Sequence, residues 1–154
     1  RQMCIRDRIL PALLKEQPKS IVIANRTVEK AERIAKEFSS KALQASKSSN
    51  LIASSLSFEA LKDFEFDVVI NATSVSTNPS QNLNLDESVF RNTSLALDLY
   101  YSQAFTPFMD LADRAKVPNV IDGWGMLVEQ AAESFFLWTG FKPDTSELIA
   151  KHGE

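Results

Sequence analysis

The chain has 154 residues, of which 44% are hydrophobic and 24% charged, the balance of an ordinary soluble globular protein with a core of its own. No apolar run approaches the roughly 20 residues of a membrane span. A formal net charge of −3 argues against a nucleic-acid partner, because such partners usually need a basic face. The single cysteine, Cys4, excludes an internal disulfide and fits a reducing cytoplasm. Cys4 and the lone His152 cannot form a zinc site between them, so no metal is expected and both are interpreted as incidental.

The first part of the chain predicts a strand that leads directly into a helix. Residues 9–15 look like the end of a helix, and residues 17–20 form a turn into a strand at 20–24. The polar triplet Asn25-Arg26-Thr27 ends this strand, and a helix is predicted at about 28–38. Its buried face follows the spacing i, i+3, i+4, i+7, with Ala31, Ile34, Ala35 and Phe38 at these positions.

This strand-to-helix junction is typical of a dinucleotide-binding fold, where it selects the cofactor. A carboxylate there accepts hydrogen bonds from the ribose 2′-hydroxyl of NAD, whereas an arginine accommodates the 2′-phosphate of NADP. Here the position is Arg26 with no acid beside it, and a guanidinium can hold a phosphate by two parallel hydrogen bonds. With Thr27 as the N-cap, Lys30 lies in the first turn, where the helix dipole disfavours a cation unless an anion lies in front of it. The junction predicts an NADP site; a surface turn with a solvated lysine is the alternative.

Strands and helices alternate along the rest of the chain. A short strand is predicted at 41–46, a serine-rich loop at 46–57 and a short helix near 58–61. A near-continuous apolar run predicts a strand at 66–71 that is covered on both faces. The further elements are a polar loop at 75–84, a strand at 94–99, a helix that begins at Thr106 and Pro107 and runs to about 116, a brief strand at 119–121, and the longest helix, at 123–138, which Gly140 ends. The alternation predicts a doubly wound, parallel α/β sheet in one domain.

The four glycines of the chain all lie in its last third, at positions 123, 125, 140 and 153. A nucleotide-binding fold needs a glycine-rich turn after its first strand, because only glycine lets backbone N–H groups approach the pyrophosphate. The chain contains no such G-x-G-x-x-G turn, and residues 1–8 show neither strand nor helix periodicity. We therefore expect the first strand and its phosphate-binding loop to be missing. Residues 1–8 would be a stretch outside the fold, and residues 9–154 an incomplete Rossmann-like domain.

Three blocks of sequence together resemble the C-terminal, NADP-binding half of the shikimate dehydrogenase family. They are Ala24-Asn25-Arg26-Thr27, Asp67-Val68-Val69-Ile70-Asn71-Ala72-Thr73-Ser74 and Asp122-Gly123-Trp124-Gly125-Met126-Leu127-Val128-Glu129-Gln130-Ala131-Ala132. The stretches 98–101, 106–108 and 137–140 fit as well, so the resemblance runs from about residue 9 to the C-terminus. This family reduces 3-dehydroshikimate to shikimate with NADPH, a step of aromatic amino-acid biosynthesis.

The resemblance implies roles for particular residues. Those that would hold the adenosine 2′-phosphate are Asn25, Arg26, Thr27 and Lys30. Those that would line the cofactor crevice or meet the nicotinamide end are Ala72, Thr73, Ser74, Leu99, Gly123 and Met126. Tyr101 and Gln130 would contact the substrate, and Gly123, Met126 and Gln130 share one helix face. Core packing is the alternative for Met126, and a buried tyrosine with a satisfied hydroxyl for Tyr101. Trp124 and Trp138 are assigned to packing.

The chain also departs from the family pattern. Ser76 stands where the family usually has glycine, so the loop after Ser74 would be shaped differently. The catalytic lysine and aspartate of the family lie in an N-terminal substrate domain, which we expect to be missing from this chain, and the adjacent Lys62 and Asp63 match no family motif. We therefore expect no catalytic residue in this chain and no dehydrogenase activity from it alone.

The leading interpretation is the cofactor-binding half of an NADP-dependent shikimate dehydrogenase located in the cytoplasm. Its expected partners are a small-molecule substrate, shikimate or 3-dehydroshikimate, with neither nucleic acid nor membrane, and a homodimer is compatible with the intact enzyme. Two alternatives stay open: a quinate/shikimate dehydrogenase of broader cofactor use, and a non-catalytic nucleotide-binding module. Arg26 and Lys30 argue against a preference for NAD.

Overall fold

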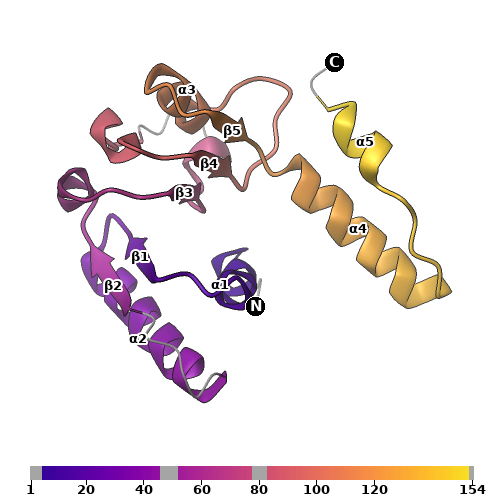
Figure 1. The fold of residues 1–154 in the computed structure, drawn as a ribbon, viewed down its shortest axis with the longest axis horizontal. Coiled ribbons are helices and arrows are strands. Elements are labelled where there is room, and N and C mark those ends of the chain that lie inside the picture. The colour runs from indigo at the N-terminus through magenta and orange to yellow at the C-terminus, as the bar shows by residue number, and fades with distance from the viewer. Residues whose placement is uncertain (1–4, 46–51, 78–82, 153–154) are drawn as a thin grey trace. The chain divides into compact units, whose positions relative to one another are not determined.

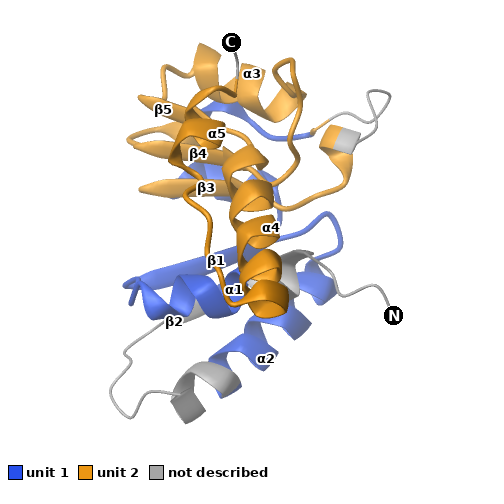
Figure 2. Ribbon diagram, turned by 90° about the vertical axis from the view of Figure 1, so that its right-hand side faces the viewer, with its two compact units in different colours: residues 1–64, 84–89 blue, residues 65–83, 90–154 orange. Residues whose placement is uncertain are grey.

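The computed structural model describes residues 5–45, 52–77 and 83–152, and within them the protein is an α/β structure with open parallel sheets (Figure 1). The chain divides into two compact units (Figure 2). The first unit comprises residues 1–64 and 84–89, and the second unit comprises residues 65–83 and 90–154. The described strands form two separate sheets, one in each unit. No helix in these described ranges is long and apolar enough to cross a membrane.

The first unit is a two-stranded parallel sheet with helices. Its elements are α1 (Ile5–Lys15), β1 (Ser20–Ala24), α2 (Val28–Ala45), β2 (Ile52–Leu56) and a 3₁₀ helix at Glu59–Asp63. β1 and β2 pair from Ser20↔Ile52 to Ala24↔Leu56, and α2 packs against both strands. α2 buries the side chains of the predicted helix face, Ala31, Ile34, Ala35 and Phe38.

Three predictions for the first unit were wrong. Residues 41–45 continue α2 instead of forming a strand, because lysine, alanine, leucine and glutamine are strong helix formers. Residues 52–56 form β2 although the serine-rich composition predicted a loop, since parallel pairing with β1 overrides the weak strand propensity of serine. Residues 5–8, which showed no helix periodicity in the sequence, are helical, because α1 begins at Ile5. Residues 46–51 lie outside the described part of the chain.

The second unit is a three-stranded parallel sheet in the order β3-β4-β5. Its strands are β3 (Val68–Asn71), β4 (Leu95–Asp98) and β5 (Asn119–Ile121), and its helices are α3 (Pro107–Arg114), α4 (Trp124–Thr139) and α5 (Ser146–Ala150). A short 3₁₀ helix lies at Val75–Thr77, and another, at Glu87–Phe90, crosses from the first unit into the second at Phe90. The strands at 68–71, 95–98 and 119–121 confirm the predicted strands to within two residues at either end.

The core of the second unit lies between the sheet and α3. This helix contacts β4 and β5 and buries Phe108, Met109 and Ala112. The ring of Phe108 meets that of Phe90 edge-on, with the centroids 5.5 Å apart. Thr106 caps α3 as predicted, because its side chain accepts the N–H of Met109 and Pro107 takes the first helical position.

The C-terminal part of the second unit has one helix that the sequence predicted, α4, and one that it did not, α5. Gly140 ends α4 in the left-handed conformation, with φ +72°, and its N–H donates to the carbonyl oxygen of Phe136 at 2.8 Å. The helix α5, which packs against α4, was not predicted. The longest helix is α2, with 18 residues against 16 in α4, because α2 runs past its predicted end.

Candidate functional site

The junction after β1 exposes two cationic side chains in the first unit. Asn25 follows the strand, and its side-chain oxygen accepts the N–H of Thr27 at 3.0 Å. The carbonyl oxygen of Thr27 then accepts the N–H groups of Lys30 and Ala31, which starts α2. Lys30 therefore lies in the first turn of α2, as predicted, and Arg26 lies two residues before the helix; both are exposed. Two cations beside a helix start form a donor set that fits a phosphate.

The turns that follow β3, β4 and β5 begin side by side in the second unit (Figure 1). Asn71, the last residue of β3, is in register with Asp98, the last residue of β4. The N–H of Leu99 donates to the carbonyl oxygen of Asn71 at 3.0 Å, and the N–H of Gly123 donates to that of Tyr100 at 3.1 Å. These turns carry the predicted site residues Ala72, Thr73, Ser74, Leu99, Tyr101 and Gly123. They lie at the carboxyl ends of the strands, where open α/β sheets bind ligands.

A buried carboxylate joins two of these turns. Asp98 is 0% exposed, and one of its oxygens accepts the hydroxyls of Ser76 and Thr106, at 2.5 and 2.6 Å. Its other oxygen accepts the N–H of Tyr100 at 3.1 Å. The Ser76 hydroxyl in turn accepts a side-chain N–H of Asn71 at 3.0 Å. Asp98 therefore ties the turn after β3, the turn after β4 and the start of α3 to one another.

The turn after β3 is also closed by the side chain of Asn71. The side-chain oxygen of Asn71 accepts both the N–H and the hydroxyl of Thr73, at 3.1 and 2.7 Å. The Thr73 hydroxyl accepts the N–H of Val75 at 3.3 Å. Thr73 is half-buried in this network, whereas Ala72 and Ser74 are exposed. The hydroxyl of Thr73 therefore shapes the turn, and the surface of the turn is formed by its two neighbours.

The backbone around position 123 leaves no room for a side chain, so this position requires glycine. A Cβ atom at this position would lie 2.3 Å from the carbonyl oxygen of Leu99 and 2.7 Å from its carbonyl carbon. Gly123 has an ordinary φ of −78°, so the need is for space and not for an unusual conformation. The resemblance implies that this glycine leaves space for the nicotinamide. The described contacts show that it also leaves space for the backbone of the turn after β4.

Tyr101 lies on the turn after β4 beside the start of α4. This residue is 48% exposed, so the alternative of a buried tyrosine was wrong. The ring of Tyr101 lies 6.0 Å from those of Tyr100 and Trp124. Trp124 also stacks on the ring of His152, with the centroids 4.9 Å apart. His152 is therefore part of the packing of this junction, and the interpretation that it is incidental was wrong.

The face of α4 that carries Met126 and Gln130 lies opposite its buried face. Val128 and Ala132 are the buried residues of this helix, and at 100° per residue their direction is roughly opposite to that of Met126 and Gln130. Gln130 is exposed and Met126 is half-buried. The prediction that the amide of Gln130 is buried was wrong, so folding does not require a partner for it. Trp138, assigned to packing, is 83% exposed in the described structure.

The predicted site residues divide between the two units. The first unit contains Asn25, Arg26, Thr27 and Lys30, and the second unit contains Ala72, Thr73, Ser74, Leu99, Tyr101, Gly123, Met126 and Gln130. Sequence reasoning assigned no role to Ser76, Asp98 or Asp122, whose side chains hold the turns of the second unit. The signal for Asp98 was an aspartate at the end of the apolar run Leu95–Asp98, where burial of its carboxylate requires donors from elsewhere.

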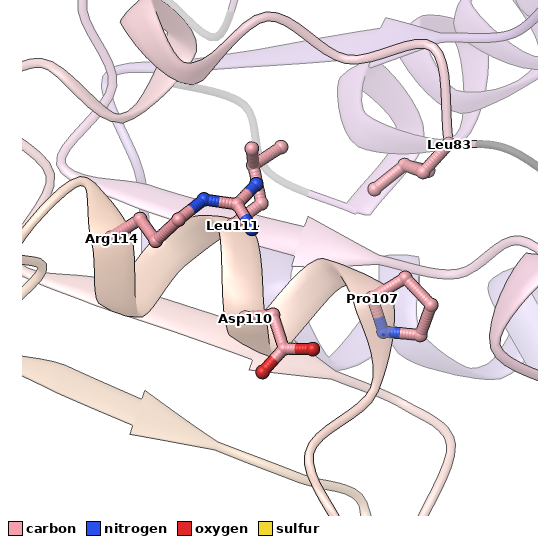
Figure 3. A pocket seen from close by; sticks show the side chains of 5 residues that line it. All are labelled: Leu83, Pro107, Asp110, Leu111 and Arg114. Carbon is pink, nitrogen blue, oxygen red and sulfur yellow. The ribbon is translucent and has the colours of Figure 1, made fainter.

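A shallow pocket lies on the outer side of α3 in the second unit (Figure 3). Leu83, Pro107, Asp110, Leu111 and Arg114 line it. None of them is a predicted site residue, and the pocket is lined by Leu83 and by residues of α3 rather than by the strand ends. It is therefore separate from the turns described above.

The resolved pKa shifts belong to groups at the surface. The pKa of Asp86 is lowered, chiefly because its carboxylate accepts hydrogen bonds from the hydroxyl and N–H of Ser88. The pKa of Asp144 is lowered in the same way by the N–H and hydroxyl of Ser146. The pKa of Lys142 is raised by its ion pair with Glu133. These shifts come from local partners and not from burial.

Open parallel sheets with polar turns at the carboxyl ends of their strands are typical of the class of Rossmann-like α/β domains. The family model described as shikimate/quinate 5-dehydrogenase matches residues 5–101 of this chain. That of the shikimate 5′-dehydrogenase C-terminal domain matches residues 123–150. The chain therefore belongs to the shikimate/quinate dehydrogenase family.

Shikimate dehydrogenases (NADP⁺) from several bacteria are similar to most of this chain. Each of these proteins is longer than the chain. The shikimate dehydrogenase (NADP⁺) of Nitrosospira multiformis is 41% identical over 141 residues, which are 92% of this chain and 48% of that protein. The protein of the same name from Dechloromonas aromatica is 39% identical, over 93% of this chain and 48% of that protein. The chain thus spans about half the length of the curated relatives that it matches.

Solved structures show the same likeness. An Ael1 enzyme from Pseudomonas putida is 36% identical, with a TM-score of 0.76 over 97% of this chain and 51% of that one. A shikimate dehydrogenase solved in complex with NADP⁺ is 31% identical, with a TM-score of 0.65 over 88% of this chain and 47% of that one. The α/β fold predicted from the sequence is confirmed by these structures.

Two glycines of the junction between β5 and α4 give a matched test of the packing against Leu99. We expect Gly123→Ala to lower the free energy of unfolding by about 1–3 kcal/mol, because the new methyl group overlaps a backbone carbonyl. Gly125→Ala should raise it by roughly 0.5–1 kcal/mol, because this glycine is inside α4 and a Cβ there meets only the Ile149 side chain, at 3.8 Å. Chemical unfolding of the two variants measures the difference, and equal effects would contradict the close approach.

Proposed function

We propose that this chain is the cofactor-binding half of an NADP-dependent enzyme that reduces 3-dehydroshikimate to shikimate. The observation that carries the proposal is the exposed pair Arg26 and Lys30 between the end of β1 and the first turn of α2. This pair has the charge and position that the adenosine 2′-phosphate of NADP needs. The names of the relatives from Nitrosospira multiformis and Dechloromonas aromatica support both the cofactor and the substrate.

In this proposal the residues of the chain bind and orient, and the cofactor supplies a hydride for the C3 carbonyl carbon when it is bound. Asn25 shapes the turn that presents Arg26, since its side-chain oxygen holds the N–H of Thr27. Ala72, Thr73 and Ser74 form one wall of the cofactor crevice, and Leu99, Gly123 and Met126 meet the nicotinamide end. Tyr101 and Gln130, both exposed, contact polar groups of the substrate. The proton for the carbonyl oxygen comes from a lysine–aspartate pair that this chain does not supply.

A hybrid enzyme tests the proposal. It joins this chain to the part of the Nitrosospira multiformis relative that lies outside the match. We expect the hybrid to reduce NADP⁺ with shikimate as the substrate, and the 154-residue chain alone to be inactive, because the acid–base pair and the glycine-rich loop are then lacking. The assay follows NADPH absorbance, and quinate is tested separately as the comparison substrate. A soluble, folded hybrid without shikimate activity would count against the proposal, as would activity of the chain alone.

Arg26→Asp should change the cofactor preference of this hybrid. Charge-assisted hydrogen bonds contribute about 1.5–3 kcal/mol each, so we expect the Kd for NADPH to rise at least roughly tenfold while that for NADH changes little. Arg33→Asp is the matched control, since it makes the same charge change at an exposed position inside α2, one turn beyond Lys30. Equal losses for the two cofactors in titrations of the variant would show that Arg26 does not select between them.

Gln130→Ala should affect the substrate and not the cofactor. We expect the KM for shikimate to rise or kcat to fall, with the KM for NADP⁺ almost unchanged, because the amide lies one helical turn beyond Met126 on the same face. Ser134→Ala is the control: the hydroxyl of Ser134 donates to the carbonyl oxygen of Gln130 at 2.9 Å and lies on the same face of α4. Lower thermal stability with unchanged shikimate kinetics would instead assign Gln130 a structural role.

A further inference from the structure

The carboxylate of Asp122, between β5 and α4, holds three segments of the second unit together. One oxygen accepts the N–H of Ser102 at 3.0 Å and lies 2.8 Å from Nε2 of His152. The other oxygen accepts the N–H of Trp124 at 3.1 Å. The side chain of Asp122 is 7% exposed, so its charge depends on these partners for compensation.

His152 reaches this carboxylate from the C-terminal end of the described chain, two residues beyond α5. A carboxylate without a proton only accepts hydrogen bonds, so Nε2 of His152 carries the hydrogen and donates it. The imidazole stacks on the indole of Trp124 at an interplanar angle of 15°. The indole N–H of Trp124 donates to the carbonyl oxygen of Leu148 in α5, at 3.3 Å. Two different contacts therefore fix the ring of His152 beside Asp122.

The segments that meet at Asp122 are those that carry the proposed substrate contacts. Ser102 directly follows Tyr101, and Trp124 begins the helix that presents Met126 and Gln130. The distance between the turn after β4 and the first turn of α4 therefore depends on how firmly the Asp122 carboxylate is held. His152 is the side chain that holds it from outside both segments.

We propose that His152 is a positioning residue that acts through Asp122 to keep the Tyr101 turn and the start of α4 in register for the substrate. The inference rests on the proposed function in so far as Tyr101 and Gln130 are substrate contacts. His152 itself touches neither substrate nor cofactor. Its role is to orient the carboxylate whose two oxygens bind the N–H groups of Ser102 and Trp124.

The alternative is that His152 only attaches the C-terminal segment to α4. Other contacts already do so: Lys142 pairs with Glu133, the hydroxyl of Thr145 donates to Glu129, and Ile149 packs beside Gly125. Loss of His152 should therefore leave the segment in place and act locally on Asp122. The two roles predict different results, because attachment affects the whole segment whereas positioning affects the two amides that Asp122 accepts.

Two substitutions separate the hydrogen bond of His152 from its ring. His152→Phe keeps an aromatic ring against Trp124 but removes the donor, whereas His152→Gln keeps an N–H donor and removes the ring. Lys151→Ala is the control, since this neighbouring lysine is exposed and pairs with Glu147 one turn earlier in the chain. Asp122→Asn combined with His152→Phe completes a double-mutant cycle on the pair.

Amide hydrogen exchange of the chain itself gives the first readout. His152→Phe should speed exchange of the Ser102 and Trp124 amides by roughly tenfold, which is the effect of weakening one charge-assisted hydrogen bond. The amide of Leu99, which donates to the carbonyl oxygen of Asn71, should change much less. His152→Gln should restore most of the protection, and Lys151→Ala should leave it unchanged. A uniform increase at all three amides would overturn the proposal, because it would mean that His152 only stabilises the fold.

Kinetics of the hybrid enzyme give the second readout. We expect His152→Phe to lower kcat/KM for shikimate by roughly tenfold, since a small misplacement of a binding element is costly, with the KM for NADP⁺ changed less than about twofold. His152→Gln should recover most of the loss. Unchanged shikimate kinetics in an active hybrid would overturn the positioning role. An inactive parent hybrid would instead refute the proposed function, and amide exchange alone would then decide whether His152 holds the two segments.

Discussion

The carboxylate of Asp98 is withdrawn from water at the end of β4, and such a charge is tolerated only where hydrogen bonds replace its hydration. Three donors do so: the hydroxyls of Ser76 and Thr106 and the N–H of Tyr100. Each donor comes from a different segment, namely the turn after β3, the start of α3 and the turn after β4. The geometry of the strand ends in the second unit therefore follows from the need to solvate one buried charge from within the protein.

This constraint also explains why the turns are built from small polar residues. The hydroxyl of Thr106 donates to Asp98 and accepts the N–H of Met109, so one side chain both compensates the charge and caps α3. Asn71 uses its amide N–H on Ser76 and its oxygen on Thr73. Because each of these groups serves two partners, a change at one strand end is transmitted to its neighbours. The exposed surface of the turns is thereby left to residues such as Ala72 and Ser74.

Local signals predicted the parts of the fold that are determined locally. The end of β1 and the first turn of α2 were found because an apolar run stops at a polar triplet before a helical pattern, and α3 because Thr106 and Pro107 form a cap. β2 was missed because its stability comes from pairing with β1, about 30 residues away, and not from its serine-rich sequence. The contact of His152 with Asp122 was missed for the same reason, since 30 residues separate the two in sequence. Prediction failed where a partner distant in the chain decides the structure.

Ser76 departs from the glycine that the family usually has, and a partner distant in the chain explains this difference. Taken by itself, a serine in place of the glycine that the family usually has predicts a turn of different shape. In the structure its hydroxyl accepts from Asn71 and donates to Asp98, which lies 22 residues further along the chain. A glycine here would leave the buried carboxylate with one donor fewer and the Asn71 amide without this acceptor. The serine therefore belongs with Asp98, and the two positions have to be considered as a pair in any comparison with relatives.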